Sequence, residues 1–265
     1  MRPILFSIGS IQLLAAPLFA GLAAMASARY LHRYRAHAEL DSDSFWTLMV
    51  PLAVGTIAGG LLLYFFAYGG GPAKNWALML ERRRFVGGAF YGDLTGATLT
   101  AWAVWRLKGL PFRRVADLIG GAAPLGLAVM RLGCFQHGCC FGTPTDAAWA
   151  VAFDDPRSAI KGSLLGVPIH PLQLYEAVAA GLIFAAVHFG VFPRVRDGRL
   201  PAGASFLAFI VLYAVARFGL DFLRASDPGI IRPFGLTTAQ AIALASIATA
   251  AYLWKDWADR DARRR

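Results

Sequence analysis

The chain has 265 residues, of which 57% are hydrophobic and only 16% charged. This composition excludes a disordered chain, a coiled coil and a collagen-like chain, and it is more apolar than that of ordinary soluble domains. The formal net charge is +10 at pH 7. In a chain with long apolar runs, such a basic excess is typical of cytoplasmic loops, so we expect a membrane environment and no nucleic-acid partner.

The apolar residues form runs of about 20 residues, the length of a helix that crosses a bilayer. Short basic or Gly/Pro-rich patches separate these runs. The pattern predicts an all-α, polytopic integral membrane protein with a single transmembrane domain over residues 1–265. The predicted spans are Ile4–Ala28, Phe45–Tyr68, Val86–Trp105, Val115–Cys134, Leu172–Phe192, Ala202–Leu223 and Phe234–Trp254.

The distribution of Lys and Arg predicts the orientation of these spans. With the amino terminus outside and the carboxyl terminus in the cytoplasm, the inner segments carry more Lys and Arg than the outer ones. Two longer outer segments are expected, an arm at 71–85 and a small head at 142–169. The outer cluster Arg82, Arg83 and Arg84 departs from the rule; it predicts a site for anionic headgroups, or else basic side chains of the arm that snorkel to the interface.

The first span has an alternative interpretation. Ala24-Met25-Ala26 resembles a cleavage site after an apolar stretch, and cleavage there would leave six spans. A signal peptide carries its charge before the apolar run, however, whereas here the basic residues follow it. We therefore favour retention of the first span.

Ionisable side chains within spans are costly and are kept mainly for function or for pairing. Arg131 has no acidic neighbour three or four residues away, which favours an unpaired guanidinium that grips a phosphate with two prongs. Arg217 and Asp221 are four residues apart, so either a simple ion pair or substrate binding by Arg217 is consistent with the spacing. The full set comprises Asp93, Asp117, Arg131, His137, Glu176, Arg217 and Asp221.

The segment MRLGCFQHGCCFG, residues 130–142, contains all three cysteines. Its glycines, Gly133, Gly138 and Gly142, would let the chain leave the helix and direct backbone N–H groups at an anion. We expect no metal, because adjacent cysteines seldom bind one tetrahedral zinc. Small buried side chains, or a disulfide from Cys134 to either Cys139 or Cys140, are the favoured alternatives.

The segment IHPLQLYEA, residues 169–177, opens the fifth predicted span. His170 precedes a proline, which is tolerated in the first turn of a helix. Gln173, Tyr175 and Glu176 then place polar groups on an otherwise apolar helix, either for substrate binding or as hydrogen bonds between helices. We expect the polar groups of 130–142, 169–177 and the sixth span to surround one cavity open to the outer half of the bilayer.

At these residues the chain resembles the prolipoprotein diacylglyceryl transferase family. The family's GR-x-GNF-x-NGE-x-x-G signature is matched with Cys134, His137 and Cys139 where Asn, Asn and Glu are usual, and HPSQLYEA corresponds to 170–177. The later RF-x-x-EFxR motif is similar to 217–224, and the family's GQ resembles Ala239-Gln240. The resemblance runs in the same order from about the second span to the end of the chain.

The resemblance implies a seven-span enzyme of the bacterial inner membrane that needs no cofactor. Its donor is phosphatidylglycerol or another anionic phospholipid, and its acceptor is the lipobox cysteine of a prolipoprotein. The acceptor thiolate would attack the glyceryl carbon that carries the phosphate ester, with Arg131 and Arg217 on the phosphate. Two alternatives stay open: an enzyme of the same fold with another lipid or acceptor, and a non-enzymatic lipid-binding or transport protein.

The sequence departs from the family at the proposed base. The family's F-HGG-L segment aligns with residues 90–94, so Tyr91 stands where a histidine is usual. Tyrosine has an ordinary pKa near 10 and is a poor base at neutral pH. His137 or His170 would then accept the thiol proton, although His170 can equally cap the helix that follows it.

Overall fold

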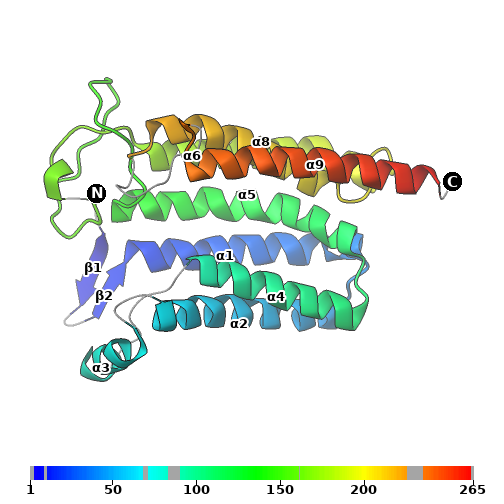
Figure 1. Ribbon diagram of the computed structural model, residues 1–265, viewed down its shortest axis with the longest axis horizontal. Helices are drawn as coiled ribbons and strands as arrows, with labels where there is room; N and C mark the ends of the chain where they lie inside the picture. Colours follow the sequence, from blue (N-terminus) through cyan, green and yellow to red (C-terminus); the bar gives the residue numbers. More distant parts are fainter. Residues whose placement is uncertain are drawn as a thin grey trace. The chain divides into compact units, whose positions relative to one another are not determined.

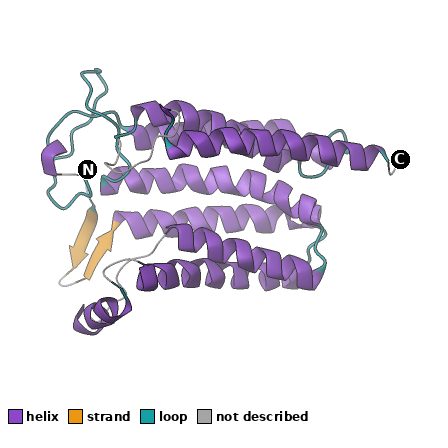
Figure 2. Ribbon diagram, in the orientation of Figure 1, coloured by secondary structure: helices purple, strands orange, loops and turns teal. Residues whose placement is uncertain are grey.

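A computed structural model describes residues 3–8, 11–67, 71–82, 90–160, 162–225 and 235–263. The chain divides into two compact units, one made of Met1–Tyr34 with Arg113–Arg265 and the other of Arg35–Phe112. Helices dominate both units, and the only strands among the described residues form one short pair (Figures 1 and 2). Whether both units act as the single predicted domain stays a prediction.

The larger unit begins with a β-hairpin rather than a helix. Strands β1 (Ile4–Ile8) and β2 (Ile11–Leu14) pair antiparallel, with Ile8 opposite Ile11, and helix α1 (Ala15–Tyr34) follows. The prediction of a helix from Ile4 is therefore wrong over residues 4–8 and 11–14. Hydrophobicity alone suggested a span, but β-branched isoleucines also favour strands.

Helix α5 (Phe112–His137) packs against α1 through small residues. A Cβ atom added to Gly133 would lie 2.5 Å from Cβ of Phe19, and one added to Gly121 would lie 2.2 Å from the hydroxyl of Tyr30. Small residues allow this close approach of two helices. The expected break of the helix at Gly133 is wrong, because α5 runs through it to His137.

The remaining long helices of this unit follow the segment after α5 (Figure 1). Helix α8 packs against both α6 and α9. Asp117 of α5, which is fully buried, accepts backbone N–H groups of Gly203 and Ser205 at 2.7 and 2.9 Å. This carboxylate therefore caps the start of α8 and has a structural role. The segments are α6 (Leu172–Ala185), η3 (Ala186–Val191) with α7 (Phe192–Arg196), α8 (Ala204–Leu220) with η4 (Asp221–Leu223), and α9 (Thr238–Ala262).

The smaller unit is built on a helix pair. Helices α2 and α4 approach so closely that a Cβ atom added to Gly96 would lie 2.0 Å from the carbonyl oxygen of Gly55. The buried Asn75 of α3 donates from Nδ2 to the carbonyl of Phe65 at 3.0 Å, which satisfies a backbone acceptor at the end of α2. The elements are η1 (Arg35–Ala38), α2 (Ser42–Ala67), α3 (Pro72–Arg82) and α4 (Phe90–Lys108).

Four helices are long and apolar enough to cross a membrane, as judged over the described residues. Helices α1, α4 and α9 overlap in sequence the other three predicted spans, but they are not among the four helices that meet this criterion. The mostly helical architecture is confirmed, whereas the count of seven spans and the orientation stay predictions. The four helical segments are Ser42–Phe66, Phe112–His137, Leu172–Arg196 and Ala204–Leu223.

The segment between α5 and α6 forms a compact head with its own small core. Phe153, Ile160 and Ile169 are buried together, and Ile169 pairs with both Pro144 and Val151 in isolated bridges. One short 3-10 helix, η2 (Gly162–Leu164), lies in this segment, and apolar burial fixes the remainder. This small core therefore holds the head, the segment between Gly138 and Pro171, against the ends of α5 and α6.

Candidate functional site

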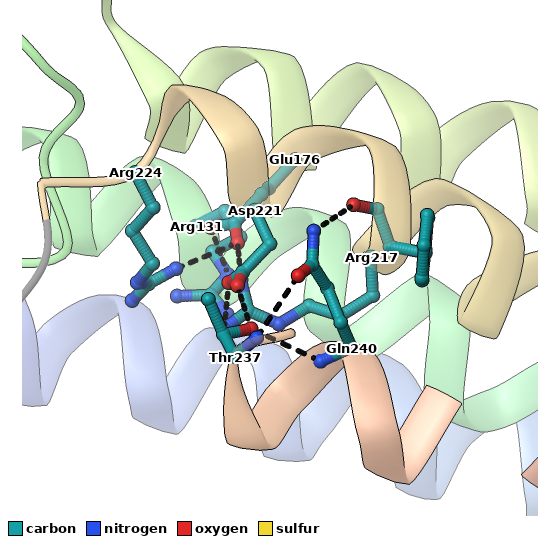
Figure 3. Close-up of polar contacts among 8 residues, drawn as sticks. Arg131, Glu176, Arg217, Asp221, Arg224, Thr237 and Gln240 are labelled. Atoms are coloured by element: carbon teal, nitrogen blue, oxygen red, sulfur yellow. Dashed lines mark hydrogen bonds and ion pairs between the residues drawn. The ribbon is translucent and has the colours of Figure 1, made fainter. Parts of the chain in front are cut away.

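Three arginines from three elements converge on one carboxylate (Figure 3). Oε2 of Glu176 on α6 lies 3.0 Å from Nε of Arg131 on α5. Its Oε1 lies 3.3 Å from Nη1 of Arg217 on α8 and accepts from Nη1 of Arg224 at 3.1 Å. These four residues, called the Glu176 cluster below, lie near the ends of α5, α6 and α8 where the head segment begins and ends.

Arg131 is paired, contrary to the expectation of an isolated guanidinium. Its partner Glu176 is distant in sequence, and both side chains are largely buried, at 12% and 7% exposure. The contact between Nε and Oε2 is a charge contact, since neither atom has a hydrogen-bond partner among the described residues. Two buried polar atoms thus keep hydrogen-bonding capacity, a costly arrangement that is common at sites that bind a ligand.

A second carboxylate extends the cluster toward α9. Nη2 of Arg217 lies 3.0 Å from Oδ1 of Asp221, so the ion pair expected from their spacing is confirmed. The hydroxyl of Thr237 donates to the other oxygen of Asp221. Thr237 also caps α9, accepting from the backbone N–H of Gln240 at 3.1 Å, while Oε1 of Gln240 accepts from the backbone N–H of Thr237 at 3.0 Å.

The cluster with Asp221 has an excess of positive charge. It contains the guanidinium groups of Arg131, Arg217 and Arg224 and the carboxylates of Glu176 and Asp221. Three cations against two anions leave one positive charge without a counterpart in this group. A buried surplus of this sign favours the binding of an anion.

The pocket beside these residues is narrow. Arg131, Glu176, Tyr213 and Arg217 line it, and its volume of about 10 Å³ holds roughly one water molecule. Of the residues expected around one cavity, Arg131, Glu176 and Arg217 line this pocket, and His137, His170, Gln173 and Tyr175 do not. An opening toward the outer half of the bilayer stays a prediction. A phospholipid headgroup would need these side chains to move apart.

His170 and Tyr175 form a separate hydrogen-bonded group. Nδ1 of His170 lies 3.3 Å from the hydroxyl of Tyr175, which also accepts from Nε1 of Trp149 at 2.6 Å. Helix α6 begins after Pro171 as expected, without a side-chain hydrogen bond at its cap. The interpretation of His170 as a helix cap is therefore wrong, and its use as a base stays a prediction.

Gly138, Gly142 and Gln173 hold the backbone of residues 138–142, which follow α5 and are called the cysteine-rich loop below. The N–H of Gly138 donates to the carbonyl of Cys134 at 2.9 Å, and that of Gly142 donates to the carbonyl of His170 at 3.2 Å. These N–H groups are occupied, so the expectation that they face an anion is wrong. Nε2 of the buried Gln173 donates to the carbonyl of Cys139 at 2.6 Å.

The three cysteines are free and lie together. The sulfur atoms of Cys134, Cys139 and Cys140 all lie within 4.8 Å of one another. Of the two alternatives that the sequence offered, the disulfide from Cys134 to Cys139 or Cys140 is not formed among these described residues. His137, half-buried at the end of α5, contributes no ring nitrogen to this group.

Some predicted residues cannot be placed in the site. Tyr91 lies in the first turn of α4, and Arg82 ends α3; both belong to the smaller unit, and only their backbone is described. Arg83 and Arg84 lie outside the described residues. Roles for these four residues stay predictions.

Sequence reasoning missed two parts of the site. Arg224 lies just after the sixth predicted span and matches the arginine of the RF-x-x-EFxR motif, but it is not among the predicted site residues. Thr237 and Gln240 fall within the seventh predicted span, and nothing in the sequence indicated that Thr237 binds Asp221. Arg224, Thr237 and Gln240 could have been identified as polar residues at the end of the sixth apolar span and the start of the seventh.

Comparison with known proteins gives a consistent result. The family model described as prolipoprotein diacylglyceryl transferase matches residues 3–255. Several relatives are named phosphatidylglycerol–prolipoprotein diacylglyceryl transferase. The relative from Geobacter sulfurreducens is 36% identical to this chain, over 71% of this chain and 68% of the relative. In Solidesulfovibrio magneticus the identity is 33% over 84% and 82% of the two chains. In Aromatoleum aromaticum it is 31% over 93% and 91%.

Family and architecture agree with each other. The match extends over nearly the whole chain, including the first helix and the Glu176 cluster. With four helices able to cross a membrane, the protein is a multi-pass membrane protein. The chain belongs to the prolipoprotein diacylglyceryl transferase family.

Proposed function

We propose that this protein transfers a diacylglyceryl group from phosphatidylglycerol to the lipobox cysteine of a prolipoprotein. The names of the relatives support this reaction. The observation that carries it is the Glu176 cluster, in which three arginines share one buried carboxylate. An enzyme that cleaves a lipid phosphate ester needs such a group of cations where negative charge develops on the leaving phosphate.

The donor's phosphate would enter between Arg131 and Arg217. Each of these arginines already has a carboxylate partner, Glu176 or Asp221, that orients it. A phosphate would compete with Glu176 for the guanidinium groups and use the unpaired N–H of Arg131. Bidentate contacts then stabilise the glycerol phosphate anion as it leaves.

The acceptor thiol must lose its proton before it attacks. The half-buried His170, linked to Tyr175, and His137 are the candidate bases of the larger unit. Imidazole is the side chain that most often serves as a general base in enzymes. Tyr91 takes the place of the family's histidine and is the weaker candidate.

The membrane setting follows from the same proposal. Seven spans in the bacterial inner membrane, with the amino terminus outside, would put the Glu176 cluster near the outer headgroups. The cluster of Arg82, Arg83 and Arg84 would then attract anionic lipid to this side, each residue contributing about 1 kcal/mol. The head segment would cover the site from above.

The test is a transfer assay with purified full-length protein. We expect it to move radiolabelled diacylglyceryl groups from phosphatidylglycerol vesicles to a lipobox peptide and to sustain a strain depleted of its own transferase. A Cys→Ser lipobox peptide is the control and should accept nothing. Transfer only from another phospholipid, or only to another thiol, would indicate the same fold with a different substrate; no transfer from any donor would contradict the proposal.

A further inference from the structure

The cysteine-rich loop brings three thiols to one point at the end of α5. Cys134 lies in the last turns of that helix, and the chain then reverses through Gly138 with φ of +80° and Cys140 with φ of +59°. The left-handed conformation of Cys140 lets two adjacent cysteines direct their sulfurs to the same neighbour. All three sulfurs therefore lie within 4.8 Å of one another.

The surrounding structure holds this loop in place. Gln173, fully buried on α6, donates to the carbonyl of Cys139, and the N–H of Gly138 donates to the carbonyl of Cys134. A residue other than glycine rarely adopts a positive φ, and such strained residues cluster at functional sites. The hydrogen bonds from Gln173 and from Gly138 thus hold the backbone beside the three cysteines in place.

We propose that Cys134, Cys139 and Cys140 bind a thiophilic divalent cation of the Zn²⁺ class through three thiolates. Zinc–sulfur bonds of about 2.3 Å put neighbouring sulfur ligands about 4 Å apart, so the thiols need only a small inward movement. A set of three protein ligands leaves the fourth position of a tetrahedral ion open, as in catalytic zinc sites.

The charges of the neighbourhood fit this ligand set. Three thiolates with a divalent cation carry one net negative charge. The Glu176 cluster with Asp221 carries one net positive charge, and its Arg131 and Arg224 are close enough to Cys140 to interact electrostatically. Each site therefore compensates the charge of the other.

The open position would take the acceptor's own thiol, a role that rests on the proposed transferase function. An ion at this position would favour the thiolate form of the bound acceptor, and the thiol proton would pass to His137, to His170 or to solvent. A sulfur lone pair then attacks the glyceryl carbon, and the carbon–oxygen bond breaks with its electron pair going to the phosphate oxygen. Glycerol phosphate leaves and a thioether forms on the acceptor, with no oxidant or reductant. The ion would thus assist deprotonation of the acceptor thiol in a chain where Tyr91 replaces the family's histidine.

Cobalt titration of the reduced full-length protein in detergent tests the binding site. Because the chain has three cysteines in all, a sulfur-to-cobalt charge-transfer band reports these residues alone. We expect one Co²⁺ to bind per chain and to be displaced by Zn²⁺. The substitution Cys139→Ser or Cys140→Ser should lower the affinity for Co²⁺ at least tenfold, as measured from the charge-transfer band. His137→Ala is the matched control and should keep the band.

A second measurement covers variants that fail to fold. Cd²⁺ should protect the wild-type thiols from a maleimide reagent, and protection should disappear with excess chelator. No band and no protection in the reduced wild type would overturn the site, as would an unchanged band in a folded Cys140→Ser protein.

Transfer assays before and after chelation separate the two proposals. We expect chelation to reduce the transfer rate and Zn²⁺ to restore it. If the protein binds Co²⁺ but transfers equally fast without metal, the ion's role is wrong and the transferase function stands. If it binds Co²⁺ and transfers nothing in either state, the proposed function fails and the metal site stands.

Discussion

Arg131 and Glu176 lie on different helices, and Nε of the arginine is 3.0 Å from Oε2 of the carboxylate. Two further arginines contact the other oxygen of Glu176. Breaking a buried ion pair by removing one partner is costly, because the other charge loses its compensation. Substitutions here will therefore affect both stability and activity, and the two effects must be measured separately.

Arg131→Ala should abolish transfer, and Arg131→Lys should lose most of it. Lysine keeps the charge but not the planar, two-pronged geometry that fits a phosphate. The rate of diacylglyceryl transfer by purified protein, compared with thermal unfolding in detergent, checks this. Arg113→Ala is the matched control, because Arg113 also pairs with a carboxylate, Asp261 at 2.9 Å; it should retain the rate. A comparable rate in Arg131→Ala would make Arg217 the leading phosphate-binding residue.

Glu176→Gln should destabilise the protein and at the same time increase its response to anionic lipid. The amide removes the negative charge that three arginines share, at a cost of about 3 to 5 kcal/mol for a buried pair. Added phosphatidylglycerol can then occupy the freed guanidinium groups. We expect a lower Tm without lipid and a larger rise in Tm with phosphatidylglycerol than in the wild type. Equal lipid responses in the two proteins would contradict anion binding at this cluster.

Gly142→Ala should destabilise the junction between the cysteine-rich loop and α6. An added Cβ would lie 2.7 Å from both Cβ and the carbonyl oxygen of His170, so backbone must shift. Overpacking of this kind costs about 1 to 3 kcal/mol. Gly181→Ala on α6 is the control, since a Cβ there meets nothing within 4 Å. Thermal unfolding should show a lower Tm for the first variant and an unchanged or higher Tm for the second.

Local patterns predicted the helices but not their partners. The apolar runs correctly predicted the positions of α2, α5, α6 and α8, because a membrane-spanning helix requires about 20 consecutive, mostly apolar residues. The same criterion failed at β1 and β2, where apolar residues form strands. Hydrophobicity reports burial or lipid contact, and it does not distinguish the two structures over a short segment.

The site was predictable as a set of residues and not as a network. Polar motifs on apolar helices pointed to Arg131, Glu176 and Arg217, which do meet. Arg131 and Glu176 lie far apart in the sequence, so local helical spacing does not predict that they pair. The proximity of the three sulfur atoms was not predictable, because the positive φ of Cys140 is not encoded in a local pattern. Whether these cysteines bind a metal stays a proposal.

Thr237→Ala should lower stability and weaken the support of Arg217. The hydroxyl of Thr237 accepts the N–H of Gln240 at the start of α9 and donates to Asp221, which in turn holds Arg217. Loss of such a cap costs about 1 kcal/mol, and Asp221 loses a hydrogen-bond donor as well.

The variant Thr237→Ser keeps the hydroxyl and should restore both the Tm and the transfer rate. Thr249→Ala on the same helix is the control, because its hydroxyl bonds only to the carbonyl of Ala245 within an exposed turn; alanine should be neutral or stabilising there. We expect Thr237→Ala to raise KM for phosphatidylglycerol more than Thr249→Ala does. Equal KM values for the two variants would mean that Thr237 caps α9 and has no influence on Arg217.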